Sequence, residues 1–237
     1  MNNNENFFCE FEKMLEAFSN AIAAEPNNAM LYAERGNNYL LWDVADKALK
    51  DHTKAIELDP NNVEFYIKRA KSYARLSQED KRLEDYNRAA ELAPNNPIVY
   101  SNRGDAYNQT GQYEKALEDF CKAIELDPTN TWAHLQCAYI HMESNRNNDA
   151  VEKLTEIINS DQNLRNVAGL YFDRARCYKA LKQHDKAEDD FAIAIELAND
   201  AYKLRYRELW AEEDEDEDEN EDIGKVLEQI MRKFPVG

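Results

Sequence analysis

Hydrophobic and small residues recur along the chain at spacings of three, four and seven, which place them on single faces of helices. The pattern itself has a period of 34 residues, marked by prolines at positions 26, 60, 94 and 128. An aromatic column of the repeat reads Tyr32, Tyr66, Tyr100, His134 and Tyr171. A column of small residues reads Gly36, Ala70, Gly104, Ala138 and Ala175. Each repeat therefore predicts two amphipathic helices that form a hairpin.

The period defines five units, at 29–62, 63–96, 97–130, 131–164 and, after three extra residues, 168–201. Small residues allow the two helices of a unit to approach closely, while the aromatic columns fill the space between neighbouring hairpins. Proline ends each second helix because it has no N–H to donate. Asparagines that follow the prolines, such as Asn62 and Asn96, are suited to cap the next helix.

A resemblance to the tetratricopeptide repeat rests on one pattern of the third unit, which consists of Tyr100, Arg103, Gly104, Tyr107, Ala116, Phe120, Ala123 and Pro128. The resemblance covers about residues 29–201. It implies an all-α fold, a right-handed α-solenoid of helix-turn-helix hairpins. It also implies a role in protein–protein interaction, but the family spans co-chaperones, transcription regulators and assembly scaffolds, so the fold does not specify the partner.

The segments outside the repeats have characters of their own. Residues 1–28 contain a lone helix that resembles the second half of a unit, and residues 202–210 predict a helix that caps the last hairpin. Residues 211–222 are an acidic linker, with ten acids and one asparagine from 212 onwards. Residues 223–237 predict an amphipathic helix whose apolar face, at 223–234, packs back on the repeats, self-associates or binds a partner.

Two departures from the repeat pattern stand out. Arg82 occupies a column in which the other units have alanine, so its side chain must leave the helix interface or push the hairpin apart. In the fourth unit, His134, Cys137 and His141 occupy columns of packing residues. The extra residues that follow this unit predict a change of geometry near 160–168.

Composition and charge argue against several classes of partner and of fold. The chain has 29 basic and 47 acidic residues, a net charge of −18, which disfavours nucleic acid and anionic membranes as partners. Six glycines are too few for a fold built on phosphate-binding loops. The chain start shows no signal peptide and no apolar run is long enough to span a membrane, so we expect a cytoplasmic protein with reduced cysteines.

Catalytic and metal chemistry find little support in the sequence. His134, Cys137 and His141 share a helical face, as zinc ligands can, but their columns are packing columns and no fourth ligand is placed beside them. Cys177 and His184 lie on different helices without an orienting third group. We therefore predict no enzyme activity, no cofactor and no metal.

In folds of this kind, the first helix of each hairpin lines a concave groove that receives peptides or helices. The groove-lining residues with side chains suited to bind a peptide are Asn37, Lys68, Lys71, Arg75, Asn102, Asp105, Gln109, Trp132, Gln136, Tyr139, Phe172, Arg176 and Lys179. Basic and acidic residues balance along this groove, although the whole chain is acidic. The set does not match the lysines, asparagines and arginine with which some co-chaperones of the family grip a C-terminal carboxylate.

The sequence therefore favours a cytoplasmic adaptor or scaffold that binds a protein or peptide partner in this groove. The alternative is a chaperone-like protein that holds a basic client through its acidic tail. That tail is otherwise a solvated spacer, or an autoinhibitory segment that competes for Lys68, Lys71 and Arg75. An enzyme with a convergent site is the third and weakest class.

Overall fold

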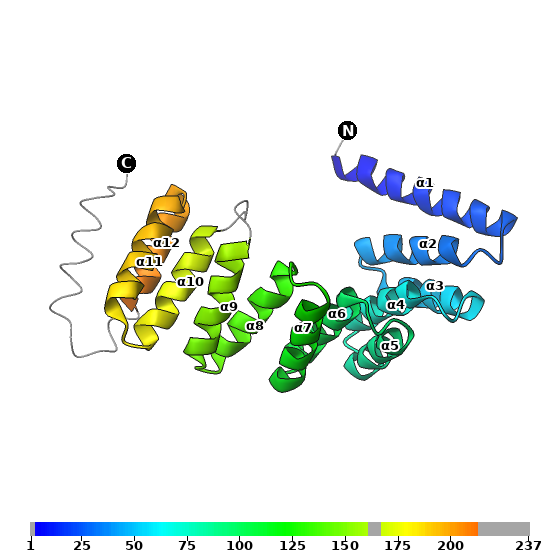
Figure 1. Ribbon diagram of the computed structural model, residues 1–237. Coiled ribbons are helices and arrows are strands. Elements are labelled where there is room, and N and C mark those ends of the chain that lie inside the picture. Colours follow the sequence, from blue (N-terminus) through cyan, green and yellow to red (C-terminus); the bar gives the residue numbers. More distant parts are fainter. Residues whose placement is uncertain (1–2, 161–166, 213–237) are drawn as a thin grey trace. The chain divides into compact units, whose positions relative to one another are not determined.

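The computed structural model describes residues 3–160 and 167–212, and this part of the chain is built from helices without a strand (Figure 1). The predicted all-α fold class is therefore confirmed. The helices divide between two compact units, residues 1–128 and 129–237, each of which is described by itself. The prediction of altered geometry concerns residues 160–168, most of which lie outside the described residues. The two units meet after Pro128, which is one of the four prolines that mark the period of 34 residues.

Unit 1 contains one lone helix and three hairpins. Its helices are α1 (Asn3–Ala24), α2 (Ala29–Leu41), α3 (Ala45–Leu58), α4 (Val63–Arg75), α5 (Glu79–Leu92), α6 (Pro97–Gln109) and α7 (Tyr113–Leu126). The ring of Phe11 on α1 stacks on Trp42, which follows α2, with 4.1 Å between the ring centroids. The lone helix is thus attached to the first hairpin by an aromatic contact.

Within its described residues, unit 2 contains two hairpins and one further helix. Its helices are α8 (Thr131–Glu143), α9 (Asn147–Ser160), α10 (Val167–Ala180), α11 (His184–Leu197) and α12 (Asp200–Glu212). α12 reaches two residues into the segment predicted as an acidic linker. The remainder of that linker and the predicted helix at 223–237 lie outside the described residues.

Asparagine caps begin the first helix of several hairpins. The side chains of Asn28, Asn62 and Asn96 each accept a hydrogen bond from the backbone N–H two residues later, and Asn130 accepts from Ala133. Such a cap satisfies one of the N–H groups that have no partner within the helix. The predicted capping by the asparagines after each proline is therefore confirmed.

The turn inside each hairpin places one residue in the left-handed region. The residues with positive φ are Asp43, Ser77, Gly111, Asn145 and Lys182. Their common place in the repeat shows that the turn geometry is set by the hairpin. Only one of these positions holds glycine, which adopts positive φ without a steric cost, and this shared turn could not be recognised from glycine alone.

A bidentate ion pair ties the two helices of most hairpins together. Arg69 donates to both carboxylate oxygens of Asp85 at 2.8 and 2.6 Å. The same pair recurs sixteen residues apart at Arg35–Asp51, Arg103–Asp119 and Arg174–Asp190. In the unit 63–96 the guanidinium also lies 5.8 and 5.7 Å from the ring centroids of Tyr66 and Tyr73. The tyrosine columns therefore enclose a charged pair rather than a purely apolar core.

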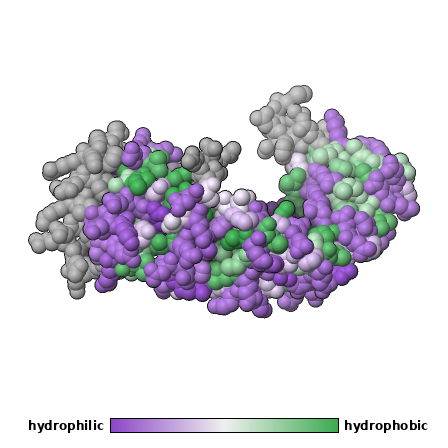
Figure 2. All heavy atoms as spheres, viewed as in Figure 1, coloured by the Kyte–Doolittle hydropathy of each residue, from purple (hydrophilic) through white to green (hydrophobic). Residues whose placement is uncertain are grey.

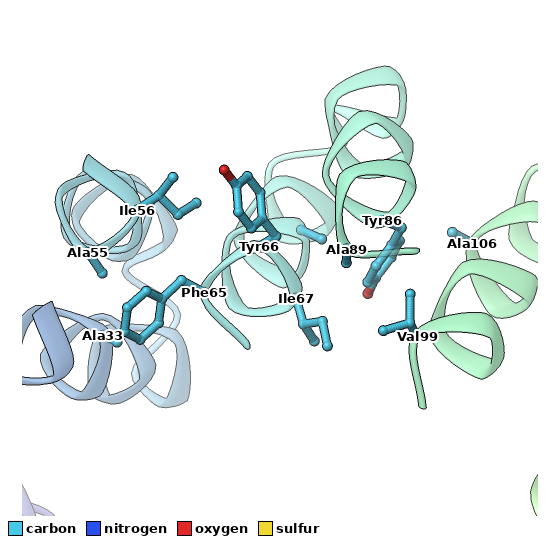
Figure 3. Close-up of a cluster of buried hydrophobic side chains, with 11 residues drawn as sticks. Ala33, Ala55, Ile56, Phe65, Tyr66, Ile67, Tyr86, Ala89, Val99 and Ala106 are labelled. Atoms are coloured by element: carbon cyan, nitrogen blue, oxygen red, sulfur yellow. The ribbon is translucent and has the colours of Figure 1, made fainter. Parts of the chain in front are cut away.

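The core of unit 1 continues from one hairpin to the next. Figure 3 shows Phe65 of α4 directed toward Ala33 of α2, and Tyr86 of α5 lying beside Val99 of α6; all four are at most 2% exposed. His52 is also fully buried, with Nδ1 2.8 Å from the Ser72 hydroxyl, and burial lowers its pKa to about 4. It is therefore neutral at pH 7.

Candidate functional site

In each unit the first helices of the hairpins present a surface that we call the A-helix face of that unit, formed by α2, α4 and α6 in unit 1 and by α8 and α10 in unit 2. Figure 2 shows one side of the molecule, on which hydrophilic residues predominate and hydrophobic ones lie between them. Large apolar side chains on this face include Leu41, which is 80% exposed, and Trp132, which is 54% exposed. Side chains of this size in water are candidate contacts for a partner.

In unit 1 the A-helix face contains a hollow of about 360 Å³, which we call the α2–α4 hollow. It is lined by Leu40, Leu41, Lys71, Ala74, Arg75, Arg82 and Tyr86. Lys71 and Arg75 are exposed, and they lie one helical turn apart on α4. The structure thus brings together two of the three basic groove residues predicted on α4 and adds an apolar wall from α2.

Arg82 forms the floor of this hollow, which decides one of the two alternatives drawn from its column. It does not leave the helix interface, because it is 4% exposed; that it pushes the hairpin apart stays a prediction. Its guanidinium donates to Glu79 at 3.1 Å, to Gln109 at 2.7 Å and to Asp105 at 3.3 Å. Neighbouring acids and an amide can therefore accommodate the long side chain where other units have alanine.

Lys68, the third basic groove residue predicted on α4, belongs to a different cluster. The Lys68 ammonium lies 3.3 Å from Glu34 and 3.7 Å from Glu64, and its side chain is only 13% exposed. Glu34 also accepts a hydrogen bond from Asn37 at 3.5 Å. These charges compensate one another, so Lys68 contributes less to a basic surface than Lys71 and Arg75 do.

Some of the predicted polar residues of α6 also pair with other residues of the protein. Gln109 donates to Asp105 at 2.8 Å while it accepts from Arg82, so both side chains hold the floor of the hollow. Asn102 is half-buried on the A-helix face. Asp105 and Gln109 therefore make contacts within the protein, although Gln109 is also exposed, and Asn102 is a candidate peptide contact on this helix.

In unit 2 a second hollow of about 480 Å³ lies between the end of α8 and α10. Its lining residues are Tyr139, Met142, Glu143, Asn145, Asn147, Asp173, Arg176, Cys177, Lys179 and Ala180. Burial, the charge of Asp173 and a hydrogen bond to that carboxylate raise the pKa of Tyr139 to about 12. Tyr139 is therefore a fixed hydrogen-bond donor at neutral pH, and Gln136 is half-buried one turn earlier on α8.

Two predicted groove residues of α10 are covered by α12. Phe172 is 3% exposed and stacks on Tyr206 with 4.3 Å between ring centroids. Lys179 is 8% exposed, donates to the backbone carbonyl of Trp210 at 3.1 Å and lies 4.8 Å from the centroid of its ring. Helix α12 therefore covers Phe172 at the apolar end of the last hairpin, whereas Lys179, although largely buried, still borders the second hollow.

Sequence models of repeat families identify the hairpins. Models described as tetratricopeptide repeat match residues 63–96, 85–118 and 168–200, and a model described as TPR repeat matches residues 104–145. The chain belongs to the tetratricopeptide-repeat family. The family resemblance of the sequence is thereby confirmed.

Solved structures share this tetratricopeptide fold. A crystal structure of the MamA protein is 20% identical, covers 71% of this chain and 90% of that one, and has a TM-score of 0.63. YrrB, described as a TPR protein with an unusual peptide-binding site, is 20% identical, covers 77% and 92%, and has a TM-score of 0.62. MamA 41-end from Desulfovibrio magneticus RS-1 is 21% identical, covers 62% and 84%, and has a TM-score of 0.57. No curated protein matches the chain.

The histidines and cysteine of the fourth tetratricopeptide unit are placed for packing. Cys137 is fully buried, and His134 is 9% exposed with Nδ1 3.2 Å from a Glu156 carboxylate oxygen. His141 Nδ1 lies 3.8 Å from Asp149. Within the part of the chain that the structure describes, no three His, Cys, Asp or Glu side chains gather in a way that could hold a metal ion.

The sequence did not predict several of the residues that line the two hollows. The column of Tyr86 predicts packing alone, and the sequence gives no sign that Cys177, Asn145 and Asn147 line the second hollow. The signal for the first hollow was the arginine in an alanine column at position 82. Among the helices described, none combines the length and the apolar character needed to cross a bilayer.

Proposed function

We propose that the chain is a non-catalytic adaptor that binds a peptide or helix of a partner protein on its A-helix face. The observation that carries the proposal is that each unit presents a hollow on this face, bordered by large exposed apolar side chains and by charged groups. Such a combination of anchor pockets and polar rim is typical of interfaces with short segments. The peptide-binding site described for YrrB supports the proposal by analogy of fold.

The contacts that we assign to the partner are the accessible members of the predicted set. In unit 1 they are Lys71, Arg75 and Asn102. In unit 2 they are Trp132, Gln136, Tyr139 and Arg176, of which the two aromatic residues offer flat surfaces that are 54% and 40% exposed. Aromatic side chains of this kind bury much area at little entropic cost when a partner covers them.

Site-specific photocrosslinking tests which surface the partner uses. A photoreactive phenylalanine derivative is placed at Leu41 or Trp132 on the A-helix face. The matched controls are Tyr113 and Leu197, exposed apolar residues on the second helices α7 and α11. We expect the same partner to be crosslinked from the first pair of positions and not from the second. Crosslinks confined to Tyr113 and Leu197 would contradict the proposal.

The alternative, a chaperone-like protein that holds a basic client through the acidic tail, remains a prediction that concerns residues outside the described range. Affinity capture with full-length protein and with a chain that ends at residue 212 separates the two. A partner of the A-helix face remains bound after truncation, whereas a client held by the tail is lost. The crosslinks and the truncation thus report on different segments.

A further inference from the structure

The rim of the α2–α4 hollow carries two cations that internal carboxylates neutralise only weakly. Arg75 is 3.7 Å from Asp43, but these side chains are 62% and 84% exposed. A pair so open to water contributes little to stability. Lys71 is also exposed, one turn before Arg75 on α4. An incoming carboxylate can therefore approach both cations at the cost of at most one weak surface contact.

The floor of the hollow is fixed before any ligand arrives. Arg82 is held by Glu79, Asp105 and Gln109, and its guanidinium carbon lies 5.8 Å from the centroid of the Tyr86 ring. The floor does not attract an anion, because Arg82 is paired with two carboxylates, Glu79 and Asp105. Its buried Nε–H has no hydrogen-bond partner among the described residues. The floor thus supplies a rigid polar surface, while the charge preference comes from the rim.

The wall opposite the cations is aliphatic. Leu41, at the end of α2, is 80% exposed, which is the largest exposure among the described large hydrophobic residues. Leu40 and Ala74 border the same space and are half-buried. Covering Leu41 with an apolar side chain would remove most of its surface from water, which favours binding.

Charge on the rest of the chain makes this combination selective. The net charge is −18, so an acidic ligand is repelled by most of the surface and attracted locally by Lys71 and Arg75. Local attraction within a repulsive field fixes where and in which register a ligand binds. Glu79 and Asp105, the acids nearest to the floor, are engaged by Arg82.

We propose that the α2–α4 hollow binds a short segment of a partner protein in which an acidic side chain stands next to an aliphatic one. The acidic side chain pairs with Lys71 and Arg75, and the aliphatic one lies on Leu40, Leu41 and Ala74. This inference rests on the adaptor proposal and names the chemistry of its ligand in unit 1. Recognition uses side chains of the ligand and does not require the end of a chain.

The test measures fluorescence anisotropy with full-length protein and a labelled, C-terminally amidated peptide that carries two Asp-Leu pairs among serines. Comparison peptides replace aspartate with asparagine, or leucine with alanine. We expect both replacements to weaken binding, and we expect the affinity of the Asp-Leu peptide to fall as salt rises, because the cations are exposed. An asparagine peptide that binds as tightly as the aspartate peptide overturns the proposal.

Protein variants locate the site. Lys71→Glu with Arg75→Glu should lower the affinity about tenfold or more, equivalent to about 1.4 kcal/mol per tenfold step. The control, Lys50→Glu with Lys81→Glu, makes the same change of net charge at exposed positions outside the hollow and should have a much smaller effect. Equal losses in the two variants would show a general charge effect and overturn the proposal.

A third variant tests the aliphatic half. Leu41→Ser should weaken the Asp-Leu peptide several-fold and leave the weaker Asp-Ala peptide unaffected; the same loss with both peptides overturns this part. Circular dichroism checks the fold of each variant, and glutamine replaces glutamate at Lys71 and Arg75 if the double reversal is unfolded. Failure of these peptides to bind, with crosslinks still formed from Leu41 and Trp132, rejects this inference and leaves the adaptor proposal standing.

Discussion

The third and fourth hairpins use the same columns of the repeat with different chemistry. In the third, Arg103 is bidentate to Asp119 at 2.7 Å and lies 5.6 and 5.9 Å from the ring centroids of Tyr100 and Tyr107. In the fourth, the same four columns hold Cys137, Lys153, His134 and His141. The ion pair returns in the fifth hairpin as Arg174 and Asp190, so its replacement is confined to the fourth hairpin.

The comparison shows that the hairpin does not depend on one set of internal contacts. Where the arginine is replaced by a buried cysteine, Lys153 turns to Glu156 at 2.9 Å, and the same carboxylate contacts His134. The aspartate and the arginine have been exchanged together, so neither is left as a buried charge without its partner. Removal of one partner alone should therefore cost far more than exchange of both.

The largest expected effect follows from this point. Asp119→Ala should destabilise the protein by roughly 2–4 kcal/mol, because it leaves the partly buried Arg103 without its carboxylate. The double variant Arg103→Cys with Asp119→Lys, which copies the fourth hairpin, should lose less than the single variant. Urea unfolding followed by circular dichroism measures both, with exposed Glu118→Ala as the control. Additive losses in the double variant would contradict the compensation.

A second difference concerns the small-residue column. A Cβ atom on Gly104 would lie 3.0 Å from the Phe120 ring and 3.2 Å from the backbone oxygen of Ala116. Gly104→Ala should therefore cost about 1–2 kcal/mol through overpacking, and Gly104→Leu about 3 kcal/mol. In the fourth hairpin the columns of Gly104 and Phe120 hold Ala138 and Leu154, so a larger side chain in the first column is matched by a smaller one in the second.

A double-mutant cycle tests this matching of side-chain sizes. In a Phe120→Leu background, the additional cost of Gly104→Ala should be smaller than in the wild type, because leucine leaves room for the new methyl group. Equal costs in both backgrounds, measured by urea unfolding, would show that the backbone oxygen of Ala116 sets the limit. A control at Ala106, which is buried on the same helix but belongs to another column, should show no coupling with Phe120.

A smaller difference depends on pH. Burial lowers the pKa of His141, with Asp149 opposing the shift, so the folded protein favours the neutral imidazole. Stability from this group is fully present above the unfolded pKa, near about 6.5, and is lost as the pH falls below it. His141→Tyr, which restores the residue of the column, should reduce this loss in hydrogen exchange of α8 and α9. An equally steep loss of protection in the His141→Tyr variant would show that another group is responsible.

Sequence alone could predict the repeats because each column fixes a packing position. The period of the prolines and the asparagine caps indicates the hairpins directly, as Asn62 and Asn96 show. The ion pair of Arg69 and Asp85 is harder to predict, although the spacing of sixteen residues recurs in four units, because charged residues are ordinarily expected at the surface.

The candidate site was less predictable because it depends on contacts between different helices. A helical face can be assigned from spacing, which correctly placed Lys71 and Arg75 on the surface. Spacing does not reveal that Lys68 pairs with Glu34 on another helix, or that α12 covers Phe172. The selection of available residues from a predicted face therefore requires the packing of its neighbours.

The smallest expected effect concerns the turn that joins the helices of each hairpin. Gly111 in the third hairpin has φ of 73°, and Asn145 has φ of 56° at the same place in the fourth. A Cβ atom on Gly111 meets no atom within 4 Å, so a substitution there adds backbone strain without a clash. Gly111→Ala should cost about 1 kcal/mol, because side chains other than those of asparagine and aspartate disfavour this region.

Exchange of the residues at positions 111 and 145 measures the same backbone strain at positive φ. Gly111→Asn should cost less than Gly111→Ala, since asparagine adopts positive φ more readily, and Asn145→Gly should change the stability by less than about 0.5 kcal/mol. Thermal and urea unfolding of the three variants decide the order. If Gly111→Asn and Gly111→Ala lose the same stability, the asparagine of the fourth hairpin is not an adaptation to the turn, and its place beside the second hollow becomes the better reason for it.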